Sequence, residues 1–551
     1  MCDIEKICGS VYADSETTEL LEGAKLIRLP NAGKGAYIEL KSHLSENGAA
    51  LYTENELDGN AFSTFTYENC RYTVYFTPCD GDVRIVFEPL RALPTKDETK
   101  YESVASPLLT QLKLTYINVD CGMSYLIRLS DGRMVLIDGG YDDYEESERL
   151  YDHIKEQNVL PDRPVIAAWF FTHPHSDHVR AFIKLCEDHS DDVILERVIY
   201  NFASSEIYTS PFPKEQSEFL AAVASLTKTE KIIARSGDVF RFADATFTVL
   251  AVCEDLCPDE TENINNSSIV FMMELCGRKV LWLGDGLQKI SNIVTSRYSK
   301  ETIKCDYLQV GHHGYRGGSP LLYETADPSV LLWPCPDFRY QSISLWSCND
   351  FIRTSENVKN IYISGHADSV TNMATGETSY MEDVSLPYMV DIDNASRIVD
   401  LGFDSATAAA TELVPTAFSF GKDGDGRYVE MSTGGKSIPG LIHGFLLDKA
   451  EKVRVKIGAK RIGRDGVFCI MANNPTPTEE DENTVFCAST DGEKHEYDVV
   501  IDRKSAAVSL YTDGSLTETR KFEKAESAGI FFVIENAKIR LYSLSAEKEQ
   551  I

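Results

Sequence analysis

The stretch FFTHPHSDH, residues 170–178, carries the strongest structural signal in this chain. It begins with the last two residues of the apolar run VIAAWFF. It then places three of the chain's 11 histidines and one aspartate within six positions. His173 and His175 leave the end of a predicted strand on the same side and can bind one cation. Asp177 and His178 turn toward a second position as a helix begins. Imidazole and carboxylate ligands suit zinc, iron or manganese, whereas the alternative is a polar loop of surface histidines.

Two later motifs support the metal interpretation. VLWLGDG is predicted to be a buried strand followed by Asp285, a carboxylate that could bridge two cations. YLQVGHHGYRGGS is predicted to be another strand, followed by His312 and His313 between glycines. Gly-Asp-Gly alone is usually a turn, but three such motifs in this order, each after an apolar strand, reinforce one another.

The order HxHxDH, strand-ending GD and VGHHG resembles the metallo-β-lactamase superfamily. The chain is more similar to the branch that contains the hydrolase domain of the competence protein ComEC. The resemblance covers roughly residues 112–365, about half of the chain, through VLIDGG, THPHSDH, NNSSIVFMMELCGRKVLWLGD and DYLQVGHHGYRGGS. It implies an αββα sandwich with one or two metal ions at one edge.

The resemblance also implies roles for individual residues. Two divalent metal ions are expected, zinc or alternatively manganese or iron, and a metal-bound hydroxide would be the nucleophile. The implied ligands are His173 and His175 for the first metal, Asp177, His178 and His312 for the second, and Asp285 as the bridge. Asp177 is also expected to serve catalysis, and His313 is either a proton donor to the leaving group or a histidine packed behind its neighbour. Asp138 either orients the histidine ligands or ends a strand as a turn residue.

The chain departs from the family pattern in two places. Many relatives have another histidine before the strand that leads to GD, where this chain has ENINNS, residues 262–267. Asn265 or Asn266 could ligate through its amide oxygen, or water could fill the position. The ComEC-type opening carries a Gly-Asp-Ser loop, where this chain has VDCGMS, residues 119–124, which argues against a nuclease substrate.

Three further residues lie near these motifs in sequence. Tyr315 and Arg316 could meet an anionic substrate, although an ordinary exposed loop explains them equally well. His366 follows a β-type run, and a structural role is favoured over a place at the rim of the site.

Composition changes along the chain predict three domains. Residues 1–105 contain β-type runs (KLIRL, AYIEL, YTVYF, VRIVFEPL) and are predicted to form a small β-rich domain ending near LPTKDETK. Residues 106–400 open with the runs LTYINV, MSYLIRL and RMVLIDGG and then alternate strands with helices, which indicates a layered α/β domain. The resemblance implies that this is the hydrolase domain, with the metallo-β-lactamase fold. Residues 410–551, after the joint TELVPT, show only short strands and predict an antiparallel β-sandwich.

Charge and composition indicate which classes of partner and which cellular compartment to expect. The chain has 551 residues and a net charge of −32, which disfavours nucleic acid and anionic membranes and favours a small-molecule substrate. It shows no apolar stretch long enough for a bilayer and no secretory pattern, so a cytoplasmic protein with reduced cysteines is expected.

The predicted function is a metal-dependent hydrolase that cleaves a small ester or phosphodiester. One alternative is a di-iron redox protein of the same fold, although such proteins typically carry glutamate where His175 stands. The other is a binding or scaffold protein whose C-terminal sandwich, residues 410–551, recognises a sugar or a protein partner.

Overall fold

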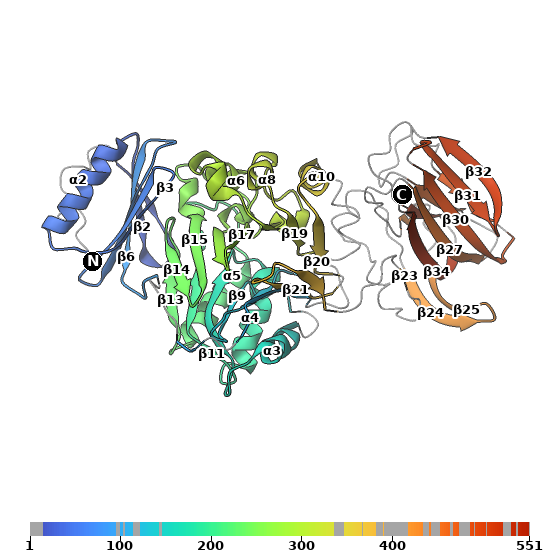
Figure 1. Ribbon diagram of the computed structural model, residues 1–551, viewed down its shortest axis with the longest axis horizontal. Helices are drawn as coiled ribbons and strands as arrows, with labels where there is room; N and C mark the ends of the chain where they lie inside the picture. The colour runs from blue at the N-terminus through green and yellow to red at the C-terminus, as the bar shows by residue number, and fades with distance from the viewer. Residues whose placement is uncertain are drawn as a thin grey trace. The chain divides into compact units, whose positions relative to one another are not determined.

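The computed structural model describes most of the chain in two compact units (Figure 1). The described residues are 15–94, 100–102, 105–113, 122–142, 146–335, 347–365, 367–381, 389–390, 417–432, 440–441, 452–462, 467–472, 485–489, 491–502, 504–521, 530–535 and 538–549. Those up to residue 381 form the first unit, and those from residue 389 form the second. The runs LTYINV, LPTKDETK (in large part) and TELVPT, together with His366, lie outside the described residues.

The first unit begins with an antiparallel sheet in the order β1-β2-β6-β5-β4-β3, covered on one face by helix α2. Its elements are β1 (Glu16–Glu19), β2 (Lys25–Leu29), α2 (Gly33–Glu46), β3 (Ala50–Leu57), β4 (Asn60–Tyr67), β5 (Cys70–Thr77) and β6 (Asp82–Pro89). The run AYIEL, predicted as a strand, lies within α2. Tyr37, Leu40 and Leu44 recur at helical spacing and are buried against the sheet, and this 3.6-residue period outweighs the local strand propensity.

The opposite face of this sheet packs against the following α/β region. Leu26, Phe62, Tyr75 and Val86 share one apolar cluster with residues of that region, among them Ile264. Whether residues 1–105 fold as a domain of their own stays a prediction, because the described part of this segment lies within the first compact unit.

Buried ion pairs cross the same boundary. Both oxygens of Asp238 accept hydrogen bonds from Arg71 Nη2, at 2.6 and 2.7 Å. Arg235 binds Glu88 at 2.9 Å on the N-terminal sheet and Glu254 at 2.9 Å in the α/β region. Charges buried in this way must be paired, so the two parts present complementary surfaces to each other.

Two facing sheets form the centre of the α/β region. One has the order β13-β12-β10-β9-β8-β7-β21-β22 with β11 beside β10, and the other has the order β14-β15-β16-β17-β18-β19-β20. The strands of the first are β7 (Leu108–Gln111), β8 (Tyr125–Arg128), β9 (Met134–Ile137), β10 (Val165–Phe171), β11 (Ile194–Leu195), β12 (Arg197–Tyr200), β13 (Glu230–Ile233), β21 (Ser369–Asn372) and β22 (Thr378–Tyr380). The strands of the second are β14 (Val239–Phe242), β15 (Ala245–Ala251), β16 (Val270–Leu275), β17 (Arg278–Trp282), β18 (Tyr307–Gln309), β19 (Val330–Trp333) and β20 (Asn360–Ile363).

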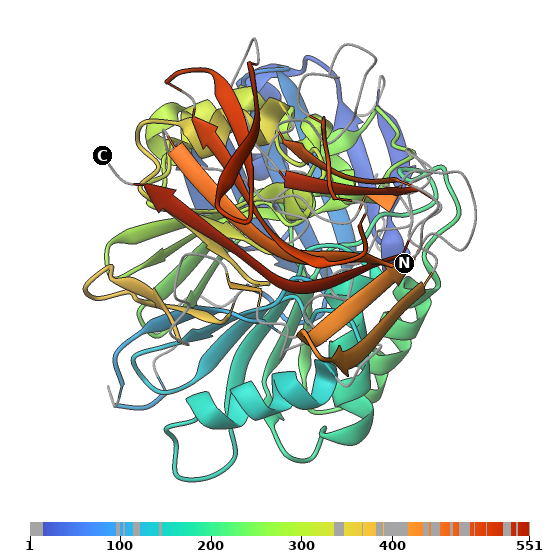
Figure 2. The same cartoon turned by 90° about the vertical axis from the view of Figure 1, so that its right-hand side faces the viewer.

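Helices cover the outer faces of these sheets (Figures 1 and 2). On one side lie α3 (Glu146–Gln157), α4 (Ser176–Asp188) and α5 (Lys214–Ser225), and on the other α6 (Gln288–Arg297), α7 (Lys300–Ile303), α8 (Pro320–Ala326) and α10 (Ser347–Thr354). An aromatic-rich core around Phe170, Phe271 and Trp282 fills the space between the sheets. A second core, around Trp169 and Phe182, lies between the first sheet and its helices. The expected αββα sandwich is confirmed.

The second unit is built from two antiparallel sheets, as predicted for the C-terminal region. The larger contains β23 (Met389–Val390), β24 (Ala417–Asp423), β25 (Gly426–Ser432), β27 (Lys452–Ile462), β30 (Lys494–Asp502), β31 (Ala507–Thr512), β32 (Ser515–Lys521) and β34 (Lys538–Glu549). The smaller contains β26 (Gly440–Leu441), β28 (Val467–Ala472), β29 (Val485–Cys487) and β33 (Ile530–Glu535).

Reduced cysteines and no membrane-spanning segment are the expectations from composition. Nine described cysteines are free, but Cys70 is disulfide-bonded, so the expectation of reduced cysteines is wrong at this position. No helix in the described parts of the chain combines the length and apolar character needed to cross a bilayer.

Candidate metal centre

The motif THPHSDH lies at the end of the central strand β10, where the chain passes into helix α4. All seven residues of β10 are buried, and the first helical residue is Ser176, with His175 in the capping position. His173 therefore lies in the short connection between strand and helix, and Asp177 and His178 lie in the first turn of α4. The chain thus delivers four candidate ligands from one edge of the sheet.

Asp285 reaches the same place from the second sheet. It follows β17 after Gly284, which has a φ of 53°. A Cβ atom at Gly284 would lie 2.7 Å from the Cβ of Thr172, so only glycine allows the two strand ends to approach so closely. This approach brings the Asp285 carboxylate between the two groups of histidines.

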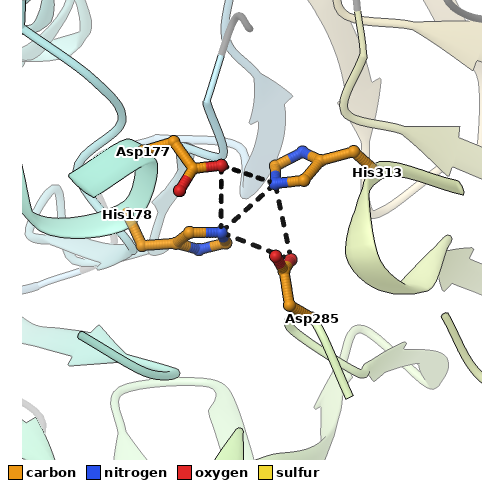
Figure 3. Close-up of side chains that lie close together, drawn as sticks. All are labelled: Asp177, His178, Asp285 and His313. Carbon is orange, nitrogen blue, oxygen red and sulfur yellow. Dashed lines mark hydrogen bonds and ion pairs between the residues drawn. The ribbon is translucent and has the colours of Figure 1, made fainter. Parts of the chain in front are cut away.

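One group of possible ligands consists of Asp177, His178, Asp285 and His313 (Figure 3). His313 Nε2 lies 2.9 Å from Asp177 Oδ2 and 3.4 Å from Asp285 Oδ1. His178 Nε2 lies 3.3 Å from the same Asp285 oxygen and 3.2 Å from His313 Nε2. Four donor atoms from four side chains match the number that a tetrahedral metal site requires.

The other group consists of His173, His175 and Asp285. His173 Nε2 lies 3.0 Å from His175 Nδ1 and 3.7 Å from Asp285 Oδ2. Asp285 therefore directs one oxygen toward each group, which is the arrangement expected of a carboxylate that bridges two cations.

The two histidines of GHHG occupy different places. His313, expected as a proton donor, lies in the four-residue group, where the sequence placed His312. His312 instead has its Nε2 3.9 Å from Asp285 Oδ2 and 2.9 Å from Asn265 Nδ2. Both residues have left-handed backbone conformations, with φ values of 50° and 52°. Two consecutive left-handed residues redirect the side chains in a way that the motif itself does not reveal.

Hydrogen bonds to the Nδ1 atoms orient these imidazoles. His178 Nδ1 lies 2.8 Å from Asp138 Oδ2, and Asp138 also accepts from the backbone and the hydroxyl of Thr172. Asp138 thus lies where the orienting interpretation placed it. His313 Nδ1 lies 2.6 Å from the carbonyl of Pro334, a partner that no sequence motif indicates. When Nδ1 donates, the lone pair of Nε2 faces the centre of the site.

Electrostatics favour a cation at this place. Burial lowers the pKa values of His173 and His175, so these imidazoles are neutral and able to coordinate. Burial also opposes the charge on His178, but the carboxylates of Asp285, Asp177 and Asp138 outweigh it and raise the pKa of His178 to about 10. Protons on this imidazole are replaced when a metal ion binds.

The four-residue group fits a divalent cation on independent grounds. Asp285 Oδ1 is buried and has no hydrogen-bond partner, although it faces the Nε2 atoms of His178 and His313. Buried polar atoms are nearly always satisfied, and a metal ion would satisfy all three of these atoms at once. Tyr315 and Arg316 come directly after GHHG in the chain, and the Tyr315 carbonyl lies 2.6 Å from His312 Nδ1.

Sequence comparisons match the part of the chain that carries these residues. Residues 119–319 match the family model of the metallo-beta-lactamase superfamily. The ComE operon protein 3 of Bacillus subtilis is 31% identical over 156 residues, which are 28% of this chain and 17% of that protein. The chain therefore matches about a sixth of the length of this relative.

Two solved structures are similar at low levels. YhfI, a metallo-beta-lactamase fold protein of Bacillus subtilis, is 13% identical, with a TM-score of 0.31, and the match covers 47% of this chain and 96% of YhfI. CmlA, a diiron beta-hydroxylase of Streptomyces venezuelae, is 13% identical, with a TM-score of 0.28, and the match covers 53% of this chain and 50% of CmlA. Residues 119–319 are therefore similar to the metallo-β-lactamase superfamily, in agreement with the αββα sandwich.

Proposed function

We propose that this protein is a metal-dependent hydrolase that cleaves a small ester or phosphodiester. The observation that carries the proposal is the pair of donor groups that share Asp285, one oxygen facing each group. Divalent cations held there would lower the pKa of a water molecule and stabilise negative charge on the scissile group.

The side chains divide the remaining work between buried and open positions. His173 and His178 are fully buried and can only hold and orient, as can Asp138 behind them. Asp177 and His312 keep 20% and 24% of their side-chain surface exposed, so a substrate reaches the centre past these two residues. Asp177 lies at this opening, with Oδ2 2.9 Å from His313 Nε2, so it is placed to contact substrate as well as metal.

The proposed size of the substrate rests on the net charge of the whole chain. A net charge of −32 repels polyanions at long range, which favours a small substrate over long nucleic acid. The fold alone does not determine which bond is cleaved, because one fold hosts many reactions. The choice of an ester or phosphodiester therefore rests on the ComEC-like motifs.

The alternative function makes the C-terminal unit a binding module for sugar or protein. Exposed aromatic side chains on one sheet face would favour that role. Among the described residues of this unit, Leu516 is the one large apolar side chain that is strongly exposed. The binding role therefore stays a prediction, and hydrolysis is the function that the described side chains support.

Metal analysis and a substrate screen test the proposal. The purified full-length chain should hold about two divalent ions, and zinc, manganese or iron added back to chelated protein should restore cleavage of chromogenic esters, lactones or phosphodiesters. Protein that binds two irons and consumes oxygen, but cleaves none of these substrates with any metal, would instead support the redox alternative.

A further inference from the structure

The two donor groups of the metal centre are unequal. Asp177, His178, Asp285 and His313 offer four donor atoms, whereas His173, His175 and Asp285 offer three. A cation bound by the second set therefore lacks one ligand that the first set supplies. A buried polar side chain beside it would be expected to complete the coordination.

Asn265 is the residue beside this gap. It lies in the short 3-10 turn Ile264–Ser267, and only 3% of its surface is exposed. Its Nδ2 donates to His312 Nε2 at 2.9 Å, and this His312 nitrogen lies 3.9 Å from the Asp285 oxygen that faces His173. Its Oδ1 is buried without a hydrogen-bond partner.

The turn that carries Asn265 is tied to both ligand-bearing segments. The backbone N–H of Ile269 donates to the carbonyl of Thr172 at 3.0 Å, next to the THPHSDH motif. The backbone N–H of Asp285 donates to Ser268 Oγ at 3.2 Å. Ile264, at the start of the turn, is buried against the N-terminal sheet. Asn265 is therefore held by fixed backbone rather than by a free loop.

The neighbouring Asn266 provides a contrast within the same turn. It is also buried, and its Oδ1 also lacks a hydrogen-bond partner. Its Nδ2, however, donates at 3.2 Å to Oγ1 of Thr261, a loop residue, whereas the Nδ2 of Asn265 donates to His312 beside Asp285. Of the two asparagines that the sequence offered as possible ligands, the structure singles out Asn265.

We propose that Asn265 binds the cation of the His173/His175 group through Oδ1, an inference that rests on the proposed function. A half-turn of the amide exchanges Nδ2 and Oδ1, so that Oδ1 would face the His312 lone pair at the 2.9 Å now spanned by Nδ2. Two lone pairs at that spacing repel unless a cation lies between them. Neighbouring ligands of an octahedral ion with bonds of about 2.1 Å are separated by about 3 Å, which matches.

This ligand has a consequence for metal preference. An amide oxygen is a harder donor than imidazole, and oxygen donors suit manganese better than nitrogen donors do. The group that contains Asn265 should therefore bind Mn²⁺ in preference to Zn²⁺ more than the same group with a histidine at position 265 would. Asn265→His should reverse this preference in favour of Zn²⁺.

Calorimetric titration of the metal-free, full-length chain with Mn²⁺ and with Zn²⁺ tests the inference, with bound metal measured after desalting. Wild type should show two binding events, and Asn266→Ala should show the same two events with the wild-type affinities. Asn265→Ala should weaken one event by about 10- to 100-fold and leave the other unchanged. Asn265→Asp, which keeps an oxygen donor, should retain both events, and this variant separates the loss of a ligand from a loss of folding.

The outcomes distinguish this inference from the proposed function. If wild type binds two ions and Asn265→Ala matches Asn266→Ala for both metals, Asn265 is no ligand, although the hydrolase proposal stands. If Asn265→Asp loses the same event as Asn265→Ala while both variants melt like wild type, an oxygen ligand at this position is also refuted. If wild type binds no divalent ion, the proposed function fails and the inference fails with it.

Discussion

Arg71 provides a test of how firmly the N-terminal sheet is joined to the α/β region. It lies on β5, and its side chain is only 3% exposed. Its Nη2 binds both oxygens of Asp238, and its Nη1 donates to the carbonyl of Ile233 at 3.0 Å. Arg71→Met keeps most of the apolar volume and removes the charge and these hydrogen bonds.

The expected cost follows from what the substitution leaves behind. Asp238 is 2% exposed, so its carboxylate would remain buried without its cation. Removal of one partner from a buried ion pair typically costs roughly 3–5 kcal/mol. Asp238 would keep one hydrogen bond from the backbone N–H of Arg235 at 2.9 Å, so the lower end, about 3 kcal/mol, is expected. This is a large fraction of the roughly 5–15 kcal/mol that stabilises a typical protein.

Tryptophan fluorescence makes the assay selective. All four tryptophans of the chain lie within residues 106–400, and three of them, Trp169, Trp282 and Trp333, are buried in the α/β region. Urea unfolding of the metal-free chain, followed by this fluorescence, therefore reports on the α/β region and not on the N-terminal sheet. Arg71→Met lies outside that region in sequence, yet it should lower the free energy of unfolding by about 3 kcal/mol if the two parts unfold together.

A matched control lies on the same sheet-and-helix layer. Lys34 pairs with Glu56 at the surface, so Lys34→Met should change the free energy of unfolding by less than about 0.5 kcal/mol. If Arg71→Met also leaves the fluorescence transition unchanged, the N-terminal sheet unfolds independently and the reasoning is wrong.

Three further predictions concern the site, the acid limit and the C-terminal unit. His175→Ala and Asp177→Ala should each reduce bound metal and abolish hydrolysis while the chain melts cooperatively; wild-type metal content in both would refute their assignment as ligands. Burial alone would raise the pKa of Asp80, but Arg84 and Thr77 lower it to about 2, so Asp80 contributes stability above its unfolded pKa of about 3.9 that is lost as the pH falls toward 2. Asp80→Asn should therefore lose less stability than wild type between pH 4 and pH 2 in acid titrations followed by circular dichroism, and an equal loss would contradict this. Deletion of residues 410–551 should leave the metal content and the cleavage of a small chromogenic substrate intact, whereas a folded truncation without metal would show that the site depends on that unit.

The sequence by itself determined the elements whose pattern is local. The buried strand before THPHSDH, the strand before Gly-Asp-Gly and the amphipathic helices were all predictable, because apolar periodicity is set by near neighbours in the chain. The candidate ligands His173, His175, Asp177, His178 and Asp285 were found in this way. The run AYIEL shows the limit of such reasoning, since a five-residue window suits a strand while the longer helical period of Tyr37, Leu40 and Leu44 decides the outcome.

Tertiary structure decided which of these side chains meet. The left-handed backbone at His312 and His313 depends on how GHHG packs between strand ends, and it directs His313 rather than His312 toward Asp177. The contact of Asn265 with His312 joins residues 47 positions apart, and the pairs from the N-terminal sheet to Asp238 and Arg235 join residues more than 140 positions apart. Periodicity and propensity carry no information about such contacts, because they arise only when separate strands end at the same edge of a folded sheet.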